Sequence, residues 1–161
     1  MQTTHITPDV DLQARFDALR GGQRLVLRGE FSGAYSVPPT AEGSEIVFDD
    51  ATIDGHDEWP KGDLNTHNGG SGYADGSLFV QRANNCRVWG HGTVRNSRGS
   101  GWRLNAEQGS EISGLDVEDC RWQLFRVDGK AHAVRNFTAK RGGMFNPTDR
   151  TAKVSNWCNS G

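Results

Sequence analysis

The sequence predicts an all-β fold, a right-handed parallel β-helix of about six turns with an N-terminal capping helix. Two columns of apolar residues recur in step along its second half, which indicates a coiled, stacked backbone. The first column, at spacings of 24, 22 and 20 residues, contains Leu78, Trp102, Leu124 and Met144. The second column stands ten residues after each of these and contains Val88, Ile112, Val134 and Val154.

The composition suits a slender, turn-rich fold with a narrow core. The chain has 161 residues, of which 21 are glycine and only 34% are hydrophobic, and its mean hydropathy is −0.68. Residues 1–76 carry 13 acidic and 5 basic side chains, whereas residues 77–161 carry 7 acidic and 13 basic ones. This asymmetry favours head-to-tail association or an anionic partner, although a solvated surface explains it equally well. The basic residues are spread along the repeats, so nucleic acid is not an expected partner.

No targeting or membrane-spanning segment is expected. The first residues have neither a basic start nor an apolar stretch, and no run of eighteen apolar residues exists. A signal peptide is therefore not predicted, and the expected location is a virion or the cytoplasm of the producing cell. The three cysteines have no C-x-x-C spacing, which favours buried free thiols over a disulfide framework or structural zinc; they are Cys86, Cys120 and Cys158.

Residues 1–22 are predicted to form a cap. Thr7-Pro8-Asp9 resembles a helix start, and Gly21-Gly22 a helix end. Between them one apolar face forms at helical spacing, from Leu12, Phe16 and Leu19. A helix of about thirteen residues is not stable alone, so we expect its apolar face to cover the first turn of the solenoid.

Residues 23–161 are predicted to form the β-helix, with one long loop. Leu25-Val26-Leu27 and Ile46-Val47-Phe48, 21 residues apart, are expected to be its first two strands. The next interval, from Ile46 to Leu78, is 32 residues, and the surplus falls at 56–76. A long loop without periodicity is usually functional or disordered, so we expect a local function to lie there.

These segments resemble right-handed parallel β-helix proteins of the pectin-lyase-like superfamily. The resemblance covers roughly residues 10–161 and rests on GGQRLVLRGEFSG, SEIVFDDATIDG, NNCRVWGHGTVRNS and ISGLDVEDC. It implies the fold and is much less informative about activity, because this scaffold carries polysaccharide lyases, glycoside hydrolases and non-enzymatic phage tail spikes.

The activity motifs of the superfamily are matched only in part. Gly90-His91-Gly92 resembles the Gly-His-Gly element of polygalacturonase-like hydrolases, but Asp49-Asp50 is expected two turns upstream of it instead of one. No Arg-Ile-Lys follows. Pectate-lyase-like enzymes combine clustered acids for calcium with a basic residue, and Asp49, Asp50 and Asp54 with Arg82 or Arg103 would imitate that set.

Metal and catalytic candidates cluster around the long loop. Oxygen ligands favour Ca²⁺, and histidine with carboxylate favours zinc or manganese; the candidate ligands are Asp54, His56, Asp57, Asp63, His67 and Asp75. A hydrophilic loop without metal explains the same residues. His91 and Asp54 are the catalytic candidates, since an imidazole can act as a general acid or base. Alternatively, Gly90 and Gly92 serve a bulged turn and His91 points outward.

Aromatic and basic side chains on the solenoid faces are candidate ligand contacts. Exposed aromatics stack on sugars, and neighbouring basic groups suit acidic glycans. The aromatic candidates are Trp59, Tyr73, Trp89 and Trp122, and the basic ones, at matching repeat positions, are Arg95, Arg98, Arg121 and Lys140. Trp102 is expected in the core.

The leading functional hypothesis is a non-enzymatic structural or glycan-contacting module of the phage virion type, such as a tail spike, fibre or head decoration. The last predicted turn shows no cap, so self-association or another subunit is expected to cover it. The alternative is a polysaccharide lyase or glycoside hydrolase, which could be truncated, acting on acidic polysaccharide.

Overall fold

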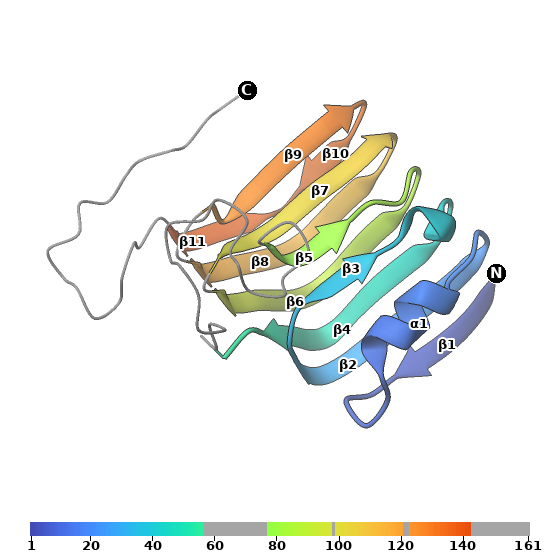
Figure 1. Ribbon diagram of the computed structural model, residues 1–161, viewed down its shortest axis with the longest axis horizontal. Coiled ribbons are helices and arrows are strands. Elements are labelled where there is room, and N and C mark those ends of the chain that lie inside the picture. Colours follow the sequence, from blue (N-terminus) through green and yellow to red (C-terminus); the bar gives the residue numbers. More distant parts are fainter. Residues whose placement is uncertain (57–76, 98, 121–122, 143–161) are drawn as a thin grey trace, which may run out of the picture.

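The computed structural model describes residues 1–56, 77–97, 99–120 and 123–142. These residues form a parallel β-solenoid of about five turns (Figure 1). The expected solenoid is thereby confirmed. The sixth turn, predicted to begin at Met144, lies outside the described residues.

Two parallel sheets make the walls of the solenoid. The large sheet runs in the order β1-β2-β4-β6-β8-β10, with β11 also pairing with β8, and consists of β1 (Gln2–Ile6), β2 (Gln23–Ser32), β4 (Glu45–Asp54), β6 (Arg87–Ser97), β8 (Glu111–Cys120), β10 (Ala133–Arg135) and β11 (Thr138–Gly142). The small sheet runs in chain order and consists of β3 (Tyr35–Val37), β5 (Ser77–Gln81), β7 (Ser100–Gln108) and β9 (Phe125–Lys130).

The apolar column of the large sheet is confirmed and extends toward the N-terminus. Each member pairs in register with the next, and the column contains Leu25, Ile46, Val88, Ile112 and Val134. Ile46, Val88 and Ile112 are completely buried. These side chains point inward because alternate residues of a strand face the same side.

The column predicted for the small sheet is wrong by one residue. Phe79, and not Leu78, lies opposite Trp102, and Trp102 lies opposite Phe125 rather than Leu124. All five residues of β5 are buried, so this strand shows no apolar–polar alternation from which its register could be inferred. The burial of Trp102 is confirmed, since its side chain is completely enclosed.

Stacked aromatic rings fill the interior between the sheets. The ring centroids of Phe79 and Trp102 are 4.4 Å apart, and Phe48 approaches both rings at 6.3 and 6.1 Å. Phe16 of the helix reaches Phe79 edge-on at 5.9 Å. Edge-to-face and tilted contacts of this kind add stabilisation beyond the buried area.

The predicted capping helix exists but is shorter than expected. α1 (Leu12–Ala18) begins four residues after Pro8, because Asp11 is the N-cap and accepts a hydrogen bond from the Ala14 amide at 3.0 Å. Its apolar face is buried against β3 and the 3₁₀ turn η1 (Pro39–Ala41), as expected for a cap. Among the described residues, no helix is long and apolar enough to cross a membrane.

Two strands were not expected from the sequence. β1 has four exposed residues and only Ile6 buried, so it has no apolar pattern and is held by its parallel pairing with β2. β3 is only three residues long.

The interval of 32 residues from Ile46 to Leu78 does not connect equivalent strands. Leu78 lies on β5, which pairs with β3 in the small sheet, whereas Ile46 lies on β4 of the large sheet.

Candidate functional site

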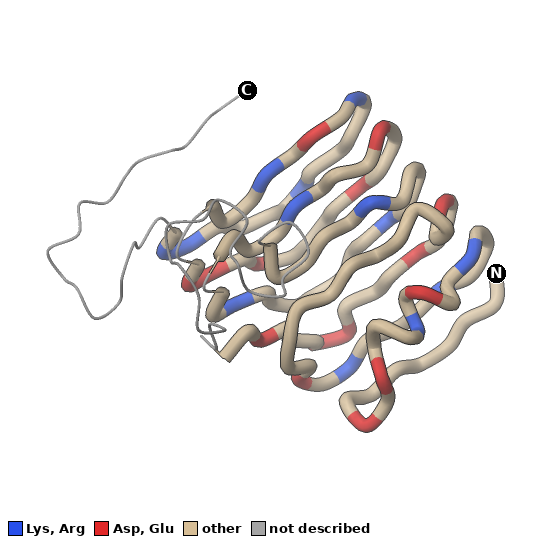
Figure 2. Tube along the Cα trace, viewed as in Figure 1, with Lys and Arg blue, Asp and Glu red and all other residues tan. Residues whose placement is uncertain are grey.

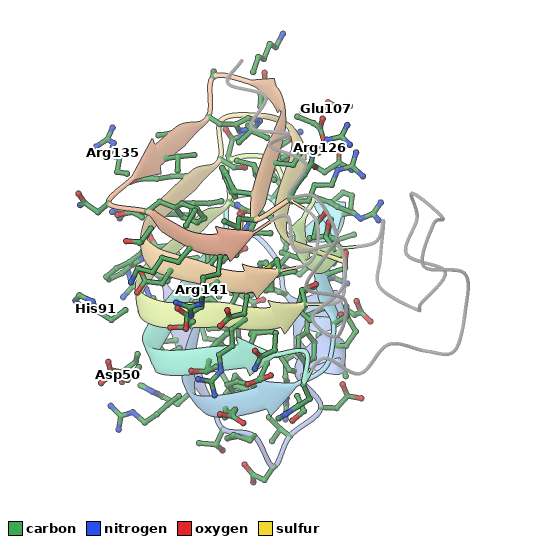
Figure 3. The ribbon with its side chains drawn as sticks, turned by 90° about the vertical axis from the view of Figure 1, so that its left-hand side faces the viewer. Asp50, His91, Glu107, Arg126, Arg135 and Arg141 are labelled. Atoms are coloured by element: carbon green, nitrogen blue, oxygen red, sulfur yellow. The ribbon has the colours of Figure 1, made fainter. Side chains whose placement is uncertain are left out.

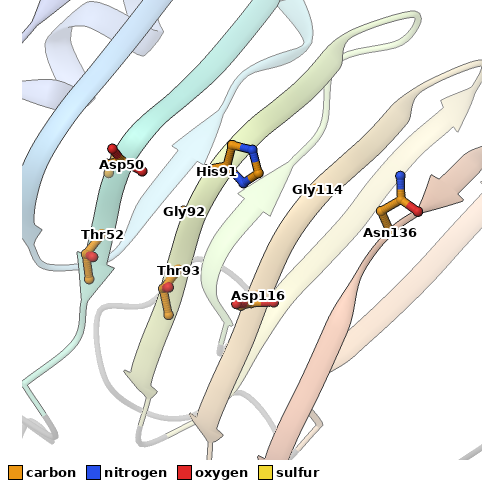
Figure 4. Close-up of a pocket in the computed structure, with 9 residues that line it drawn as sticks. Asp50, Thr52, His91, Gly92, Thr93, Gly114, Asp116 and Asn136 are labelled. Atoms are coloured by element: carbon orange, nitrogen blue, oxygen red, sulfur yellow. The ribbon is translucent and has the colours of Figure 1, made fainter.

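An open groove lies on the outer face of the large sheet (Figure 4). It has a volume of about 490 Å³ and runs across β4, β6 and β8 toward the turn between β10 and β11. Its lining is formed by Asp50, Ala51, Thr52, His91, Gly92, Thr93, Gly114, Asp116 and Asn136.

A column of backbone bulges creates the groove. The strand register shifts between Asp49 and Ala51 on β4 and between Trp89 and Gly92 on β6. In successive turns one residue there has a positive φ, and these residues are Asp50, Gly90, Gly114 and Asn136. Glycine, asparagine and aspartate are the residues that best tolerate this conformation. Bulges bend a strand and redirect its side chains.

The two glycines beside His91 are required by close backbone packing. A Cβ atom on Gly90 would lie 2.2 Å from the carbonyl oxygen of Phe48, and one on Gly92 would lie 2.5 Å from that of Ala51. Gly90-His91-Gly92 is therefore a structural bulge that leaves His91 exposed at the groove. The sequence offered both this interpretation and a catalytic one, and a bulge does not exclude the second.

The polar side chains of the groove have unused hydrogen-bonding capacity. No hydrogen bond or ion pair joins any of them to another residue in the described part of the chain, and they are Asp50, Thr52, His91, Thr93, Asp116 and Asn136. The charged rows beside them are paired instead. Arg24 binds Glu45 at 2.7 Å, and Arg87 lies 3.4 Å from Glu111.

A second polar cluster surrounds Asp54, at the end of β4. Its carboxylate is buried and accepts hydrogen bonds from Arg95 Nε at 2.7 Å, from Asn96 Nδ2 at 2.9 and 3.0 Å, and from the His56 amide at 2.7 Å. Burial alone would raise the pKa of Asp54, but the hydrogen bonds from Asn96, His56 and Arg95 lower that pKa below its usual value.

The same cluster contains two of the expected metal ligands. Ligand atoms of Glu30, Asp54 and His56 all lie within 4.8 Å of one another. However, Arg95 already bridges Asp54 and Glu30, at 2.7 and 3.0 Å. The guanidinium thus occupies the position where a cation would balance these carboxylates. The other metal candidates lie outside the described residues, namely Asp57, Asp63, His67 and Asp75.

Trp89 is half-buried on the outer face of the large sheet. The guanidinium carbons of Arg87 and Arg24 lie 5.1 and 5.9 Å from its ring centroid, within the range of a cation–π interaction. The two arginines that flank this aromatic candidate, Arg24 and Arg87, are not among the basic residues that the sequence singled out. The remaining aromatic candidates lie outside the described residues: Trp59, Tyr73 and Trp122.

The basic candidates do not form a continuous basic face. Arg95 and Lys140 occupy one row, as their matching repeat positions predict, but Glu118 lies between them and Asp54 precedes them. Figure 2 shows the two charge signs interspersed along the stack. Arg98 and Arg121 lie outside the described residues. Opposite charges in adjacent strands stabilise the sheet through cross-strand pairs.

The described cysteines behave as core residues. Cys86 and Cys120 are completely buried and free. Burial raises the pKa of the Cys86 thiol to about 11 and that of Cys120 to about 12, so neither is a reactive thiolate. The expectation of buried free thiols is confirmed for these two, and Cys158 lies outside the described residues.

The expected distance between Asp49-Asp50 and His91 is also corrected. Asp49 lies directly opposite His91 in adjacent strands, one turn away and not two, because β4 pairs directly with β6 although a long stretch of sequence separates the two strands. Sequence reasoning missed Thr52, Thr93, Asp116 and Asn136. They could have been recognised as outward-facing strand residues next to the column of bulges.

Comparison with known proteins gives no family assignment. No family model, curated protein or solved structure matches the chain. The pectin-lyase-like and phage resemblances therefore have no support beyond the sequence motifs and the parallel solenoid itself.

Proposed function

We propose that the protein is a non-enzymatic, glycan-contacting β-helix module that holds a sugar chain in the groove of the large sheet. The observation that carries this proposal is the contrast between the groove and its surroundings. The charged rows on either side are paired internally, whereas the polar groups of the groove have no partner among the described residues.

Such a lining matches the chemistry of a sugar. Hydroxyl, amide and imidazole groups both donate and accept hydrogen bonds, as sugar hydroxyls do, and carboxylates accept them. The groove crosses successive turns, so a linear glycan can lie along the solenoid axis. Trp89, two residues before His91 on β6, lies on the same outer face with the guanidinium of Arg87 over its ring.

Titration calorimetry with a panel of neutral and charged oligosaccharides tests this function. Loss of one hydrogen-bonding partner should weaken binding by about fivefold in the variants His91→Ala and Asn136→Ala. Glu107→Gln is the control, because Glu107 lies on the opposite side of the solenoid (Figure 3). Binding of no member of the panel, or equal losses in the control, would contradict the proposal.

A polysaccharide lyase or glycoside hydrolase is the second candidate. The juxtaposition of Asp49 and Asp50 with His91 across adjacent strands favours it, since such enzymes combine two acid–base groups around the scissile bond. Polysaccharides should be screened for new reducing ends and for unsaturated ends, with and without calcium. Activity that disappears in Asp50→Asn and His91→Ala would establish this candidate over the first.

We further propose that the module assembles with a second copy or another subunit, as phage tail spikes, fibres and head decorations do. Val127 and Val134 of the last described turn are 45% and 40% exposed, whereas their register partners Leu104 and Ile112 are completely buried. Size-exclusion chromatography with light scattering tests this assembly. A stable monomer at high concentration would count against it.

A further inference from the structure

The groove carries an excess of negative charge. Asp50 on β4 and Asp116 on β8 are both in its lining, and no lysine or arginine is. Neither carboxylate has a partner among the residues that the structure describes. His91 lies on β6, between the two strands that carry them (Figure 4).

The basic residues along the groove are held by other carboxylates. Arg28 donates to Asp49 at 3.0 Å, and Arg95 is shared by Asp54 and Glu30. These pairs cancel most of the positive charge that would attract an acidic ligand. Arg135 lies on the same side of the solenoid as Asp50 and His91 (Figure 3), but it is outside the groove lining.

The spacing of the two carboxylates suits a linear chain of sugars. Neighbouring strands of a sheet are about 4.8 Å apart, which is comparable to the length of one sugar unit in an extended glycan. Asp50 and Asp116 lie two strands apart in the order β4-β6-β8. Asp116 is in register with Thr93 and Thr52, two residues beyond Asp50 along the strand direction. A linear glycan that crosses the strands obliquely can therefore reach both carboxylates, with His91 and Thr93 between them (Figure 4).

We propose that the groove selects linear glycans with free amino groups, such as glucosamine polymers, over uronic acid polymers. This inference rests on the proposed glycan-contacting function. A protonated amine donates three hydrogen bonds and forms charge-assisted bonds with carboxylates. A uronate at the same place brings two like charges together and leaves the aspartates without a donor.

The test compares three oligosaccharides of equal length by titration calorimetry at about pH 6, where sugar amines are protonated and aspartates are normally ionised. The probes are a glucosamine oligomer, its N-acetylated counterpart and a galacturonic acid oligomer. Two surface ion pairs predict about tenfold tighter binding of the free amine than of the acetylated sugar. The uronate should bind weakest, and added salt should weaken only the binding of the amine.

Variants assign the selectivity to the groove. Asp50→Asn and Asp116→Asn should each weaken amine binding about threefold more than they weaken binding of the acetylated probe. Asparagine tolerates the positive φ of Asp50, so folding is preserved. Glu107→Gln is the matched control, since it removes one negative charge from the opposite side (Figure 3).

The outcomes separate this inference from the function on which it rests. Binding of none of the three oligomers contradicts both. Tightest binding of the uronate, particularly if Arg135→Gln abolishes it, overturns the amine selectivity and leaves the glycan-contacting function standing. Amine preference that persists unchanged in the double variant Asp50→Asn/Asp116→Asn also overturns this inference.

Discussion

Asp54 is a residue that the sequence singled out without revealing its surroundings. It was selected as a ligand or catalyst because it precedes a long loop rich in acids and histidines. In the structure its carboxylate is buried and receives hydrogen bonds from Arg95, Asn96 and the His56 amide. Arg95 and Asn96 are more than forty positions away along the chain, so only the folded chain brings them together.

Asp54→Asn should lower the free energy of unfolding at pH 7 by about 2 kcal/mol, since hydrogen bonds to a charged group are lost. The lowered pKa of Asp54 makes this contribution pH-dependent. It is present above the unfolded-state pKa of about 3.9 and disappears as the pH falls through the folded-state value. Urea unfolding at neutral and acidic pH measures the difference between variant and wild type.

The control for this measurement is Asp50→Asn, because Asp50 has no partner in the described residues. It should leave stability nearly unchanged at both pH values. An Asp54→Asn difference of the same size in acid as at neutral pH would show that the carboxylate charge is not the cause.

At the scale of elements, the groove depends on the bulges in the strands of the large sheet. β4, β6 and β8 each contain one residue with positive φ at the groove, and the bulges stack so closely that a Cβ on Gly114 would lie 2.3 Å from the Gly90 carbonyl oxygen. The Gly-x-Gly signal was visible in the sequence. The stacking was not, because it depends on which strands become neighbours.

Gly90→Ala should destabilise the protein by about 3 kcal/mol or more, because φ is 122° and the new Cβ would clash with the Phe48 backbone. Gly43→Ala is the matched comparison: its φ is also positive, at 71°, but nothing lies within 4 Å of the new atom. Its cost should be only about 1 kcal/mol. Thermal unfolding of both variants gives the comparison, and equal losses would contradict the role of close stacking.

At the scale of the whole molecule, the solenoid is a one-dimensional stack in which backbone pairing joins each turn to its immediate neighbours, and a few long side chains, such as Arg95 to Glu30, reach one turn farther. The most extensive strand pairings join successive strands of the large sheet, from β2 through β4 and β6 to β8. In the described residues β1 pairs on one side only, with β2. Stability should therefore vary along the axis.

Amide hydrogen exchange should be slowest in β4 and β6, whose neighbouring strands are themselves paired on both sides, and fastest in β1, which pairs only with β2 in the described residues. Mass spectrometry of peptides from the exchanged protein measures this profile. β2, which pairs with β1 and β4, provides an internal comparison and should fall between them. Uniform protection from β1 to β6 would instead indicate that the whole stack opens as one unit.

The sequence by itself determined the class of fold, the large-sheet column and the existence of a capping helix. These features depend on patterns that repeat along the chain: Val88 and Ile112 recur because each turn must present an apolar side chain to the same core. The sequence placed Leu25 and Ile46 in the column of Leu78, and only the strand pairing assigns them to that of Val88. The burial of Trp102 was predicted from its place in the other apolar column, that of the small sheet.

Only the tertiary structure decided the register of the small sheet, the polar β1 strand and the groove. β5 is buried on both faces and so carries no alternation, and β1 is held by backbone pairing, which leaves no side-chain pattern. The groove joins Asp50, His91 and Asp116 from three turns. Their proximity depends on the stacking of the strands and on the bulges. Because a long segment separates β4 from β6 in the sequence, the spacing of these residues along the chain does not indicate that they are close.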